Sequence, residues 1–178
     1  MLRGHLVWYS QMGALTQGRP RGRSHWQVRD AMRLVADAML GRLAKWLRVL
    51  GYDTLYWRGD DAGMVRLAVT EGRLVLTRDT RLPPRLPPGQ SLFIESDHYG
   101  EQLRQVIDRL GWPACSGHRC LRCNLPLEAA DKAELRGQVP EFVWHRHDRF
   151  ARCPGCLRIY WEGTHFQRMA QMVQSLCA

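Results

Sequence analysis

Apolar residues in the middle of the chain alternate between short continuous runs and helical spacing. The run 33–36 ends at Asp37, and apolar side chains then recur every three or four residues from 39 to 50, where Gly51 follows. The run is typical of a buried strand, and the spacing is typical of an amphipathic helix that ends at a glycine. The pattern therefore predicts a strand followed by a helix.

Three further short strands are predicted, and two of them are followed by a helix. The predicted strands are 54–57, 73–77 and 92–94, and the predicted helices are 62–69, ending before Gly72, and 99–110, ending at Gly111. The loop 82–89 contains four prolines, and we expect them to exclude any helix there. Strands that alternate with helices predict an α/β fold with a mostly parallel sheet flanked by helices.

The pattern changes on both sides of this region. Residues 1–31 are basic and without a sustained period, which predicts a flexible tail. Beyond residue 112, paired cysteines, prolines and two short aromatic runs, 142–144 and 159–161, predict a small module with short strands. Thr164 and Gln167 have capping-box spacing and predict a terminal amphipathic helix. We therefore divide the chain into a tail (1–31), an α/β domain (32–112) and a small C-terminal domain (113–178).

Each predicted strand is followed by at least one carboxylate. Parallel strands end at the same edge of a sheet, so these side chains are expected to meet there. Grouped carboxylates repel one another unless a cation neutralises them, and hard oxygen ligands favour Mg²⁺ or Mn²⁺. Such an ion orients water and stabilises charge on a phosphate, so phosphodiester hydrolysis is the predicted reaction. The candidate catalytic residues are Asp37, Asp60, Asp61, Asp79 and Asp97.

Helix capping is the alternative role for these acids, because aspartate is a preferred N-cap residue. Asp37 and Asp79 directly follow apolar strands, and we expect them to make the primary contacts with Mg²⁺ or Mn²⁺. The pattern leaves open whether Asp60, Asp61 or Asp97 completes the acidic site or only caps a helix.

Four cysteines form two CxxC pairs, Cys120 with Cys123 and Cys153 with Cys156. Two such pairs predict a tetrahedral zinc site. Four thiolates leave no position for substrate, so the zinc is expected to be structural and to supply folding free energy to a small module. A disulfide, or a redox dithiol at the second pair, is the alternative. The expected reducing compartment and the duplication of the motif count against both.

The net charge of the chain favours one class of binding partner. The net charge is +9, which favours binding of nucleic acid, although the excess of arginine over lysine can also reflect genomic base composition. The chain has no apolar run long enough to span a membrane, and its first residues do not form a signal peptide. We therefore expect a cytoplasmic protein that is not embedded in a membrane.

Several motifs resemble those of the Mut-seven-C (mutator C-terminal) RNase family. They are the segments 37–48, 51–54, 76–79, 119–124, 153–156 and 159–165, and the resemblance extends from about residue 33 to about residue 170. It implies a PIN-like RNase fold with an attached zinc ribbon. It also implies Asp37 and Asp79 as members of the acidic site and the four cysteines as zinc ligands. Broader PIN-like nucleases often use a helical glutamate, whereas the nearest acids here are Asp60 and Asp61.

Together these patterns predict a ribonuclease that depends on Mg²⁺ or Mn²⁺ and whose zinc ribbon aids RNA binding. The main alternative is a non-catalytic RNA-binding or ribosome-associated adaptor, in which the acids cap helices and the ribbon binds. DNA is a further candidate substrate, because metal-bound carboxylates act on the phosphodiester and do not select the sugar.

Overall fold

The computed structural model describes residues 32–111, 118–163 and Gln171. The chain forms two compact units that divide between Asn124 and Leu125. The flexible tail predicted at 1–31 and the helix predicted from Thr164 lie outside the described residues. The domain limits 32–112 and 113–178 stay predictions.

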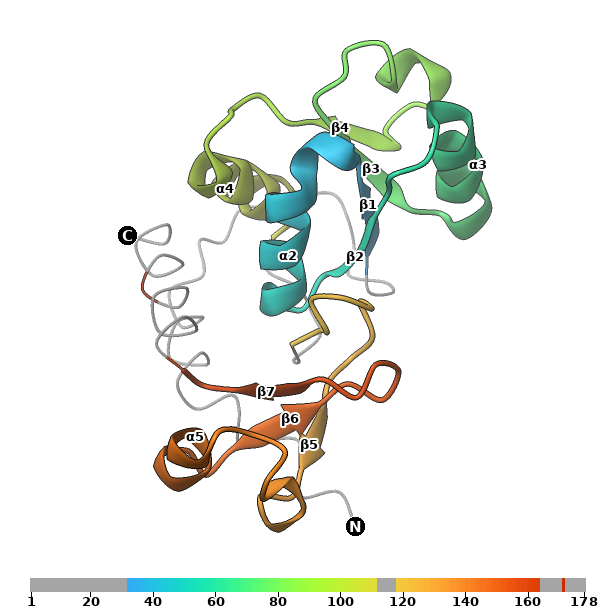
Figure 1. Ribbon diagram of the computed structural model, residues 1–178. Helices are drawn as coiled ribbons and strands as arrows, with labels where there is room; N and C mark the ends of the chain where they lie inside the picture. Colours follow the sequence, from blue (N-terminus) through green and yellow to red (C-terminus); the bar gives the residue numbers. More distant parts are fainter. Residues whose placement is uncertain (1–31, 112–117, 164–170, 172–178) are drawn as a thin grey trace. The chain divides into compact units, whose positions relative to one another are not determined.

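The first unit, here called the sheet unit, contains a four-stranded sheet (Figure 1). Its strands are β1 (Arg33–Ala36), β2 (Asp53–Tyr56), β3 (Leu74–Thr77) and β4 (Ser91–Phe93), in the order β2-β1-β3-β4. All three pairs of neighbours are parallel, and Ala36 at the end of β1 lies between Tyr56 and Leu76. The predicted parallel sheet is therefore confirmed.

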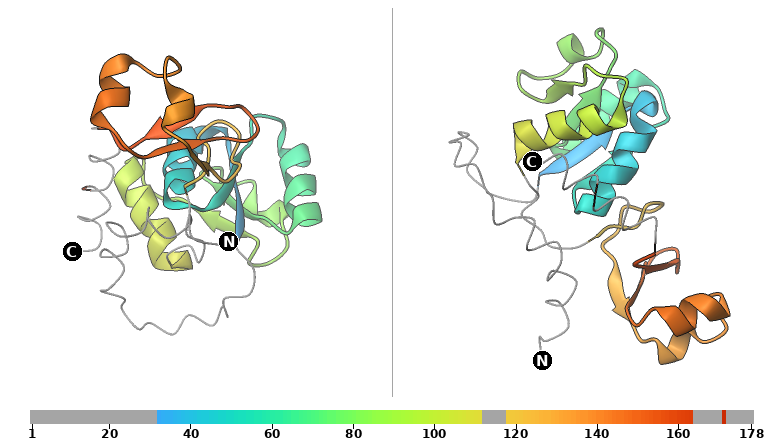
Figure 2. Two further views of the ribbon diagram at one scale, coloured as in Figure 1. Left: turned by 90° about the horizontal axis from the view of Figure 1, so that it is seen from below. Right: turned by 90° about the vertical axis from the view of Figure 1, so that its left-hand side faces the viewer.

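Three helices formed by the described residues cover the sheet. Helices α2 (Gly41–Leu50) and α4 (Tyr99–Leu110) pack on one face, and α3 (Asp61–Glu71) packs on the other (Figures 1 and 2). A short 3-10 turn, η2 (Ala38–Leu40), joins β1 to α2. Helices on both faces explain why the central strands β1 and β3 are mostly apolar, since both of their faces are buried. The fold is thus α/β with a parallel sheet flanked by helices, as predicted.

Glycines end two of these helices where the pattern placed the ends. Gly51 after α2 has φ of 102° and Gly72 after α3 has φ of 62°, both in the left-handed region. Their backbone N–H groups donate to carbonyls of the last helical turn. Glycine adopts this conformation without the steric cost of a Cβ atom, so these helix ends are local properties of the sequence.

The proline-rich loop contains a helical turn that the sequence analysis excluded. Residues Pro83–Arg85 form a 3-10 turn, η3. Prolines occupy the first two positions of the turn, where an N–H group has no helical partner and a φ near −65° suits the start of a helix. The expectation that the prolines prevent any helix is therefore wrong for this single turn.

The second unit contains a three-stranded antiparallel sheet. Its strands are β5 (Glu128–Ala130), β6 (Phe150–Arg152) and β7 (Ile159–Trp161), in that order. The predicted strand at 159–161 is confirmed. The unit also contains a 3-10 turn, η4 (Ala133–Leu135), and a short helix, α5 (Glu141–Arg146).

The predicted strand at 142–144 is wrong, because this segment lies in α5. The carbonyl of Pro140 accepts hydrogen bonds from the N–H groups of Val143 and Trp144, which starts the helix. Val143 is buried with Leu135 and Phe150, whereas Phe142 is 71% exposed. One face of the helix therefore makes the apolar contacts of this segment. A run of three aromatic and apolar residues is too short to show this helical pattern in the sequence.

Within the described ranges, no helix is long and apolar enough to cross a lipid bilayer.

Candidate functional site

The five predicted acids follow the ends of the four parallel strands. Asp37 follows β1, Asp60 and Asp61 follow β2, Asp79 follows β3, and Asp97 follows β4. Because every pair of neighbouring strands is parallel, these segments all leave the sheet at one edge, which we call the acidic edge. Their side chains differ in the partners that hold them.

Asp37 is buried, with 7% of its surface exposed, and three donors hold its carboxylate. Oδ1 accepts the N–H of Met39 at 2.8 Å and so caps η2. Oδ2 accepts the hydroxyl of Thr77 at 2.5 Å and the N–H of Arg78 at 3.1 Å. A carboxylate has about four acceptor positions, so about one remains for another partner.

Asp79 is connected to Asp37 through Thr77. The N–H of Asp79 donates to Thr77 Oγ1 at 3.0 Å, and the same hydroxyl donates to Asp37. The Asp79 carboxylate accepts the backbone N–H of Arg81 at 2.9 Å and its Nη2 at 2.9 Å. Hydrogen bonds from the side chain and then the backbone of Arg81 lower the pKa of Asp79, and the charges of Arg81 and Arg85 act in the same direction.

The other three acids have separate partners. Asp60 caps α3, because its Oδ1 accepts the N–H of Gly63 at 2.9 Å. Asp61 forms an ion pair with Arg85 at 3.1 Å, and Asp97 forms an ion pair with Arg78. The capping alternative therefore applies to Asp60 as well as to Asp37, whereas Asp61 and Asp97 pair with arginines.

Arginines thus lie among the acids of this edge. Arg78 donates its backbone N–H to Asp37 and its guanidinium to Asp97, while Arg81 and Arg85 pair with Asp79 and Asp61. In the part of the chain that the structure describes, these acids do not form a group of three or more that could hold a metal. Thr77 and Arg81 were not predicted as site residues; the signal for Thr77 is a hydroxyl at the end of a buried strand beside Asp79.

The four cysteines do form such a group. Their Sγ atoms all lie within 4.8 Å of one another, with Cys120 and Cys153 buried and Cys123 and Cys156 half-buried. A zinc–sulfur bond of about 2.3 Å implies Sγ–Sγ separations of roughly 3.8 Å in a tetrahedron. The cluster can therefore hold zinc, as expected for a zinc ribbon, after a small contraction.

The two CxxC pairs have matching backbones. The residue after each pair, Asn124 or Leu157, has a positive φ, 64° and 59° respectively. Each donates its N–H to the carbonyl of the first cysteine of its pair at 2.9 Å. The N–H of Cys123 also points at the sulfur of Cys120, at 3.3 Å. Non-glycine residues rarely adopt a positive φ, so its occurrence at equivalent positions indicates two copies of one metal-binding turn.

A buried polar network lies within the sheet unit beside the first cysteine pair. Arg73 Nη1 and Asn124 Nδ2 both donate to Asp53 Oδ1 at 2.7 Å, and Arg119 lies 3.7 Å from Asp53 Oδ2. Asn124 Oδ1 accepts the N–H of Thr54 at 3.0 Å. The network joins residues 119–124 to β2, and sequence patterns did not reveal it because its members are far apart along the chain.

This network makes stability depend on pH. Burial raises the pKa of Asp53, but the hydrogen bonds from Arg73 and Asn124 and the charges of Arg73 and Arg119 outweigh it, so the net pKa is lowered. The carboxylate therefore stabilises the fold above the ordinary aspartate pKa of about 3.9, and this contribution is lost as the pH falls through the lowered value. We expect Asp53→Asn to reduce the free energy of unfolding by about 2 kcal/mol at neutral pH.

Urea unfolding of the wild type and of Asp53→Asn, at neutral pH and below pH ~3.9, measures this effect. The difference between the two proteins should shrink at the lower pH. Asp108→Asn, at an exposed position of α4, is the control and should match the wild type. An equal loss of stability at both values of pH would show that the charge of Asp53 is not responsible.

Comparison with known proteins adds an independent observation to this geometry. The family model described as Mut7-C RNAse domain matches residues 32–173, a range that includes the whole parallel sheet, all five acids and the four cysteines. No curated protein and no solved structure matches the chain significantly. An RNase domain implies a nuclease-like function and a nucleic acid substrate. Because the match covers most of the sequence, the chain belongs to the Mut7-C RNAse domain family.

Proposed function

We propose that this protein is a PIN-like ribonuclease that hydrolyses RNA with Mg²⁺ or Mn²⁺ held by Asp37 and Asp79. The observation that carries the proposal is the link between these two acids through Thr77, at the C-terminal edge of the sheet of an RNase-family domain. The four cysteines would hold a structural zinc, and the ribbon would aid RNA binding. Reduced thiols and an RNA substrate both suit a cytoplasmic protein.

Asp37 and Asp79 supply oxygen donors of the type that a hard divalent cation prefers. Asp37 is fixed by donors from three different residues and keeps about one acceptor position for a metal. Asp79 is held by Arg81, whose side chain is 87% exposed. An exposed ion pair contributes only about 0–1 kcal/mol, so a divalent cation can replace the arginine at low cost. Oxygen ligands of this kind select Mg²⁺ or Mn²⁺.

The residues of the chain have distinct parts in this mechanism. The metal, when bound, would supply the charge that activates water and stabilises the leaving oxygen. Thr77 holds the Asp37 carboxylate in one orientation, so it acts as a positioning residue. Asp60 and Asp97 lie on the neighbouring loops and Asp61 is the first residue of α3, and one or more of them would complete the acidic site. Arg78, Arg81 and Arg85 can turn from these acids toward the phosphates of the substrate.

The test is incubation of purified protein with labelled RNA and labelled DNA, with Mn²⁺ or with EDTA. We expect RNA to be cut with Mn²⁺ and left intact with EDTA. Zinc content should be measured after the EDTA treatment, so that loss of the ribbon is not mistaken for loss of the catalytic ion. Equal cutting of DNA would identify a nuclease that does not select the sugar and would contradict the assignment to RNA.

A non-catalytic adaptor is the second candidate. The pairing of the acids with Arg78, Arg81 and Arg85 favours it, because the carboxylates are already neutralised. An adaptor would bind RNA tightly and cut neither substrate under any metal condition. That result would overturn the ribonuclease proposal.

Arg81 offers a specific test of metal binding at Asp79. Removing the guanidinium in Arg81→Ala removes the competing cation, so a lower Mn²⁺ concentration should give half-maximal cleavage. Titration of the cleavage rate with Mn²⁺ measures this shift. Arg66→Ala, at an exposed position of α3, is the control. An unchanged Mn²⁺ requirement in Arg81→Ala would show that Arg81 does not compete with the metal.

A further inference from the structure

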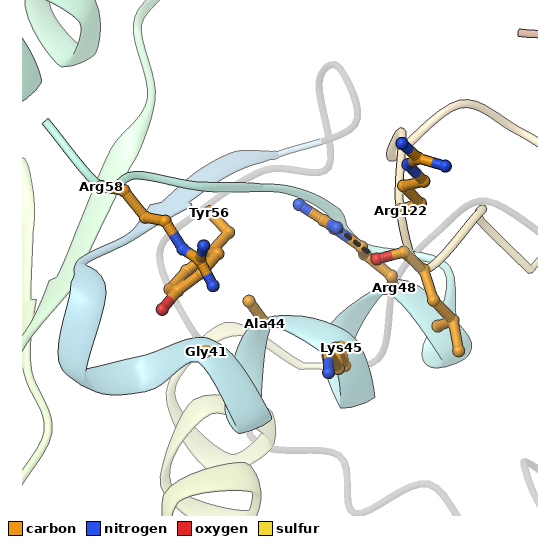
Figure 3. A pocket seen from close by; sticks show the side chains of 8 residues that line it. Gly41, Ala44, Lys45, Arg48, Tyr56, Arg58 and Arg122 are labelled. Carbon is orange, nitrogen blue, oxygen red and sulfur yellow. Dashed lines mark hydrogen bonds between the residues drawn. The ribbon is translucent and has the colours of Figure 1, made fainter. Parts of the chain in front are cut away.

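A second cluster of charges lies in the sheet unit beside the acidic edge. It lines a pocket of about 310 Å³ between α2, the end of β2 and residues 121–122 (Figure 3). Among the described residues, four of those that line the pocket are cations and none is an acid. The lining residues that determine its shape and charge are Gly41, Lys45, Arg48, Tyr56, Arg58 and Arg122.

Three of the four cations have no carboxylate partner in the described ranges. Lys45, Arg58 and Arg122 are exposed and form no ion pair there. The guanidinium of Arg58 lies over the ring of Tyr56, 5.1 Å from its centre (Figure 3). Like charges that gather in one pocket repel one another, so this arrangement favours an anion as occupant.

Arg48 has a structural role, because it connects the segments that line the pocket. It is only 6% exposed, and it donates Nε to the carbonyl of Thr54 at 2.7 Å and Nη1 to the carbonyl of Leu121 at 2.6 Å. Figure 3 shows the second of these bonds. The bond to Leu121 fixes the backbone beside Arg122. The backbone that carries Arg122 is therefore held at the pocket by a part-buried hydrogen bond from Arg48.

The pocket adjoins the acidic edge. The hydroxyl of Tyr56 donates to the carbonyl of Ala38, the residue after Asp37, at 2.9 Å. Arg58 lies two residues before Asp60. Gly41 makes the position of Tyr56 possible, since a Cβ atom there would lie 2.9 Å from Cζ and Oη of the tyrosine. The lack of a side chain at Gly41 thus lets the ring, and Arg58 over it, stand next to the acids.

We infer that this pocket binds a phosphate group of the nucleic acid backbone, next to the phosphate that is held at the acidic edge. The inference deepens the proposed function and rests on it for the phosphate at the acidic edge. Cations beside a cleavage site can bind the neighbouring phosphates of the strand and so hold it in place. Contacts with phosphate carry no sequence information and serve to position the strand. The pocket volume is at the low end of the range of about 300–1,000 Å³ for small-ligand sites, which suits one phosphate with its sugar.

The turn from Cys120 to Cys123, which we call the zinc knuckle, is part of this binding site. Leu121 and Arg122 are the two residues between Cys120 and Cys123, so the turn that presents Arg122 is the turn that the cysteines close. A zinc ion at these cysteines would hold the Arg122 backbone in place. Nucleic acid binding should therefore weaken when the zinc is lost, even in the absence of Mg²⁺ and Mn²⁺.

The test is the affinity of the full chain for a fluorescent single-stranded RNA, measured by anisotropy without Mg²⁺ or Mn²⁺ so that no strand is cut. We expect Arg58→Ala and Arg122→Ala each to weaken binding roughly tenfold, as for a lost charge-assisted hydrogen bond. Each should also make the slope of log affinity against log salt shallower by about 0.7, the value for one phosphate of a single strand. Arg66→Ala removes an equal charge from α3 and should change neither quantity.

The RNA is prepared with and without a 5′-phosphate to separate two sources of the anion. A loss of affinity in Arg58→Ala that is equal for both RNAs supports a backbone phosphate. A loss confined to the phosphorylated RNA would assign the pocket to a terminal phosphate and overturn the inference. Unchanged affinity and salt slope in both arginine variants, with thermal unfolding like the wild type, would overturn it as well.

The outcome is separable from that of the proposed function. Folded Asp37→Asn should not weaken RNA binding, because Asp37 is not among the residues that line the pocket. Loss of binding in the arginine variants supports the pocket even if the wild type cuts no RNA. Normal binding in those variants, together with metal-dependent cleavage by the wild type, would contradict phosphate binding in the pocket and still support the proposed ribonuclease.

Discussion

Asp37→Asn and Asp79→Asn are each expected to reduce Mn²⁺-dependent cleavage of RNA by about a hundredfold or more. Each change removes one of the two charged oxygen ligands that we propose for the metal. A loss of about 3 kcal/mol of transition-state stabilisation corresponds to a factor of this size. Single-turnover cleavage of labelled RNA at saturating Mn²⁺ measures the chemical step.

Folding has to be separated from catalysis in these variants. Asp37 accepts three hydrogen bonds, and the amide of asparagine can satisfy only some of these donors, so Asp37→Asn should also lose about 1–2 kcal/mol of stability. Asp79 is more exposed, and its variant should fold like the wild type. Asp108→Asn on α4 is the matched control. Full activity in folded Asp37→Asn and Asp79→Asn would place the activity at another site or in a contaminant.

Thr77→Val distinguishes positioning from metal binding. Valine has the shape of threonine but no hydroxyl, so the Asp37 carboxylate and the Asp79 N–H would both lose their common partner. We expect a smaller loss of cleavage than in Asp37→Asn, together with a higher Mn²⁺ requirement. This combination would not follow from a purely structural role, which would lower thermal stability and leave the Mn²⁺ requirement unchanged.

Cys120→Ser is expected to abolish zinc binding and to unfold the cysteine-containing region. The wild type should contain about one zinc per chain, since two CxxC pairs supply four thiolates. Structural zinc contributes roughly 10–16 kcal/mol to folding in small zinc modules. This is comparable to the total stability of a typical domain, about 5–15 kcal/mol, so loss of the zinc should unfold the region that it holds. Mass spectrometry of the metal and proteolytic mapping of residues 118–163 measure the two effects.

The control for this variant is Cys115→Ser, which makes the same chemical change outside the two CxxC pairs. It should keep its zinc and its resistance to proteolysis. Cys120→Ser should in addition weaken RNA binding, because the zinc knuckle presents Arg122 at the pocket beside Tyr56. Gently purified wild-type protein without zinc, or a Cys120→Ser variant as stable as the wild type, would contradict the proposed zinc ribbon.

Local patterns predicted much of the sheet unit. The spacing of apolar residues in α2 and α4 and the glycines after α2 and α3 gave helix ends that agree with the structure. These features depend on contacts within a few residues, which is why one sequence contains enough information for them. The strand predicted at 142–144 failed for the opposite reason. Its conformation depends on the packing of Val143 against Leu135 and Phe150, which lie outside the segment.

In the candidate site, too, some features could be predicted from the sequence and others could not. Carboxylates after successive strands and two CxxC pairs are visible in the sequence, because side-chain type and spacing limit the metals they can bind. Their partners are not visible. Thr77 meets Asp37 across 40 residues, and Arg85 meets Asp61 across 24, because parallel strands and long loops bring distant segments together.

The sequence by itself therefore determined the α/β class, the strands that carry the acids and the two cysteine pairs, since each depends on short-range periodicity or spacing. Only the tertiary structure decided which donor holds each carboxylate, that Arg78, Arg81 and Arg85 stand among them, and that four cations gather beside Tyr56. The physical reason is that such contacts arise between residues far apart along the chain. Their energies depend on distances that exist only after the strands have paired.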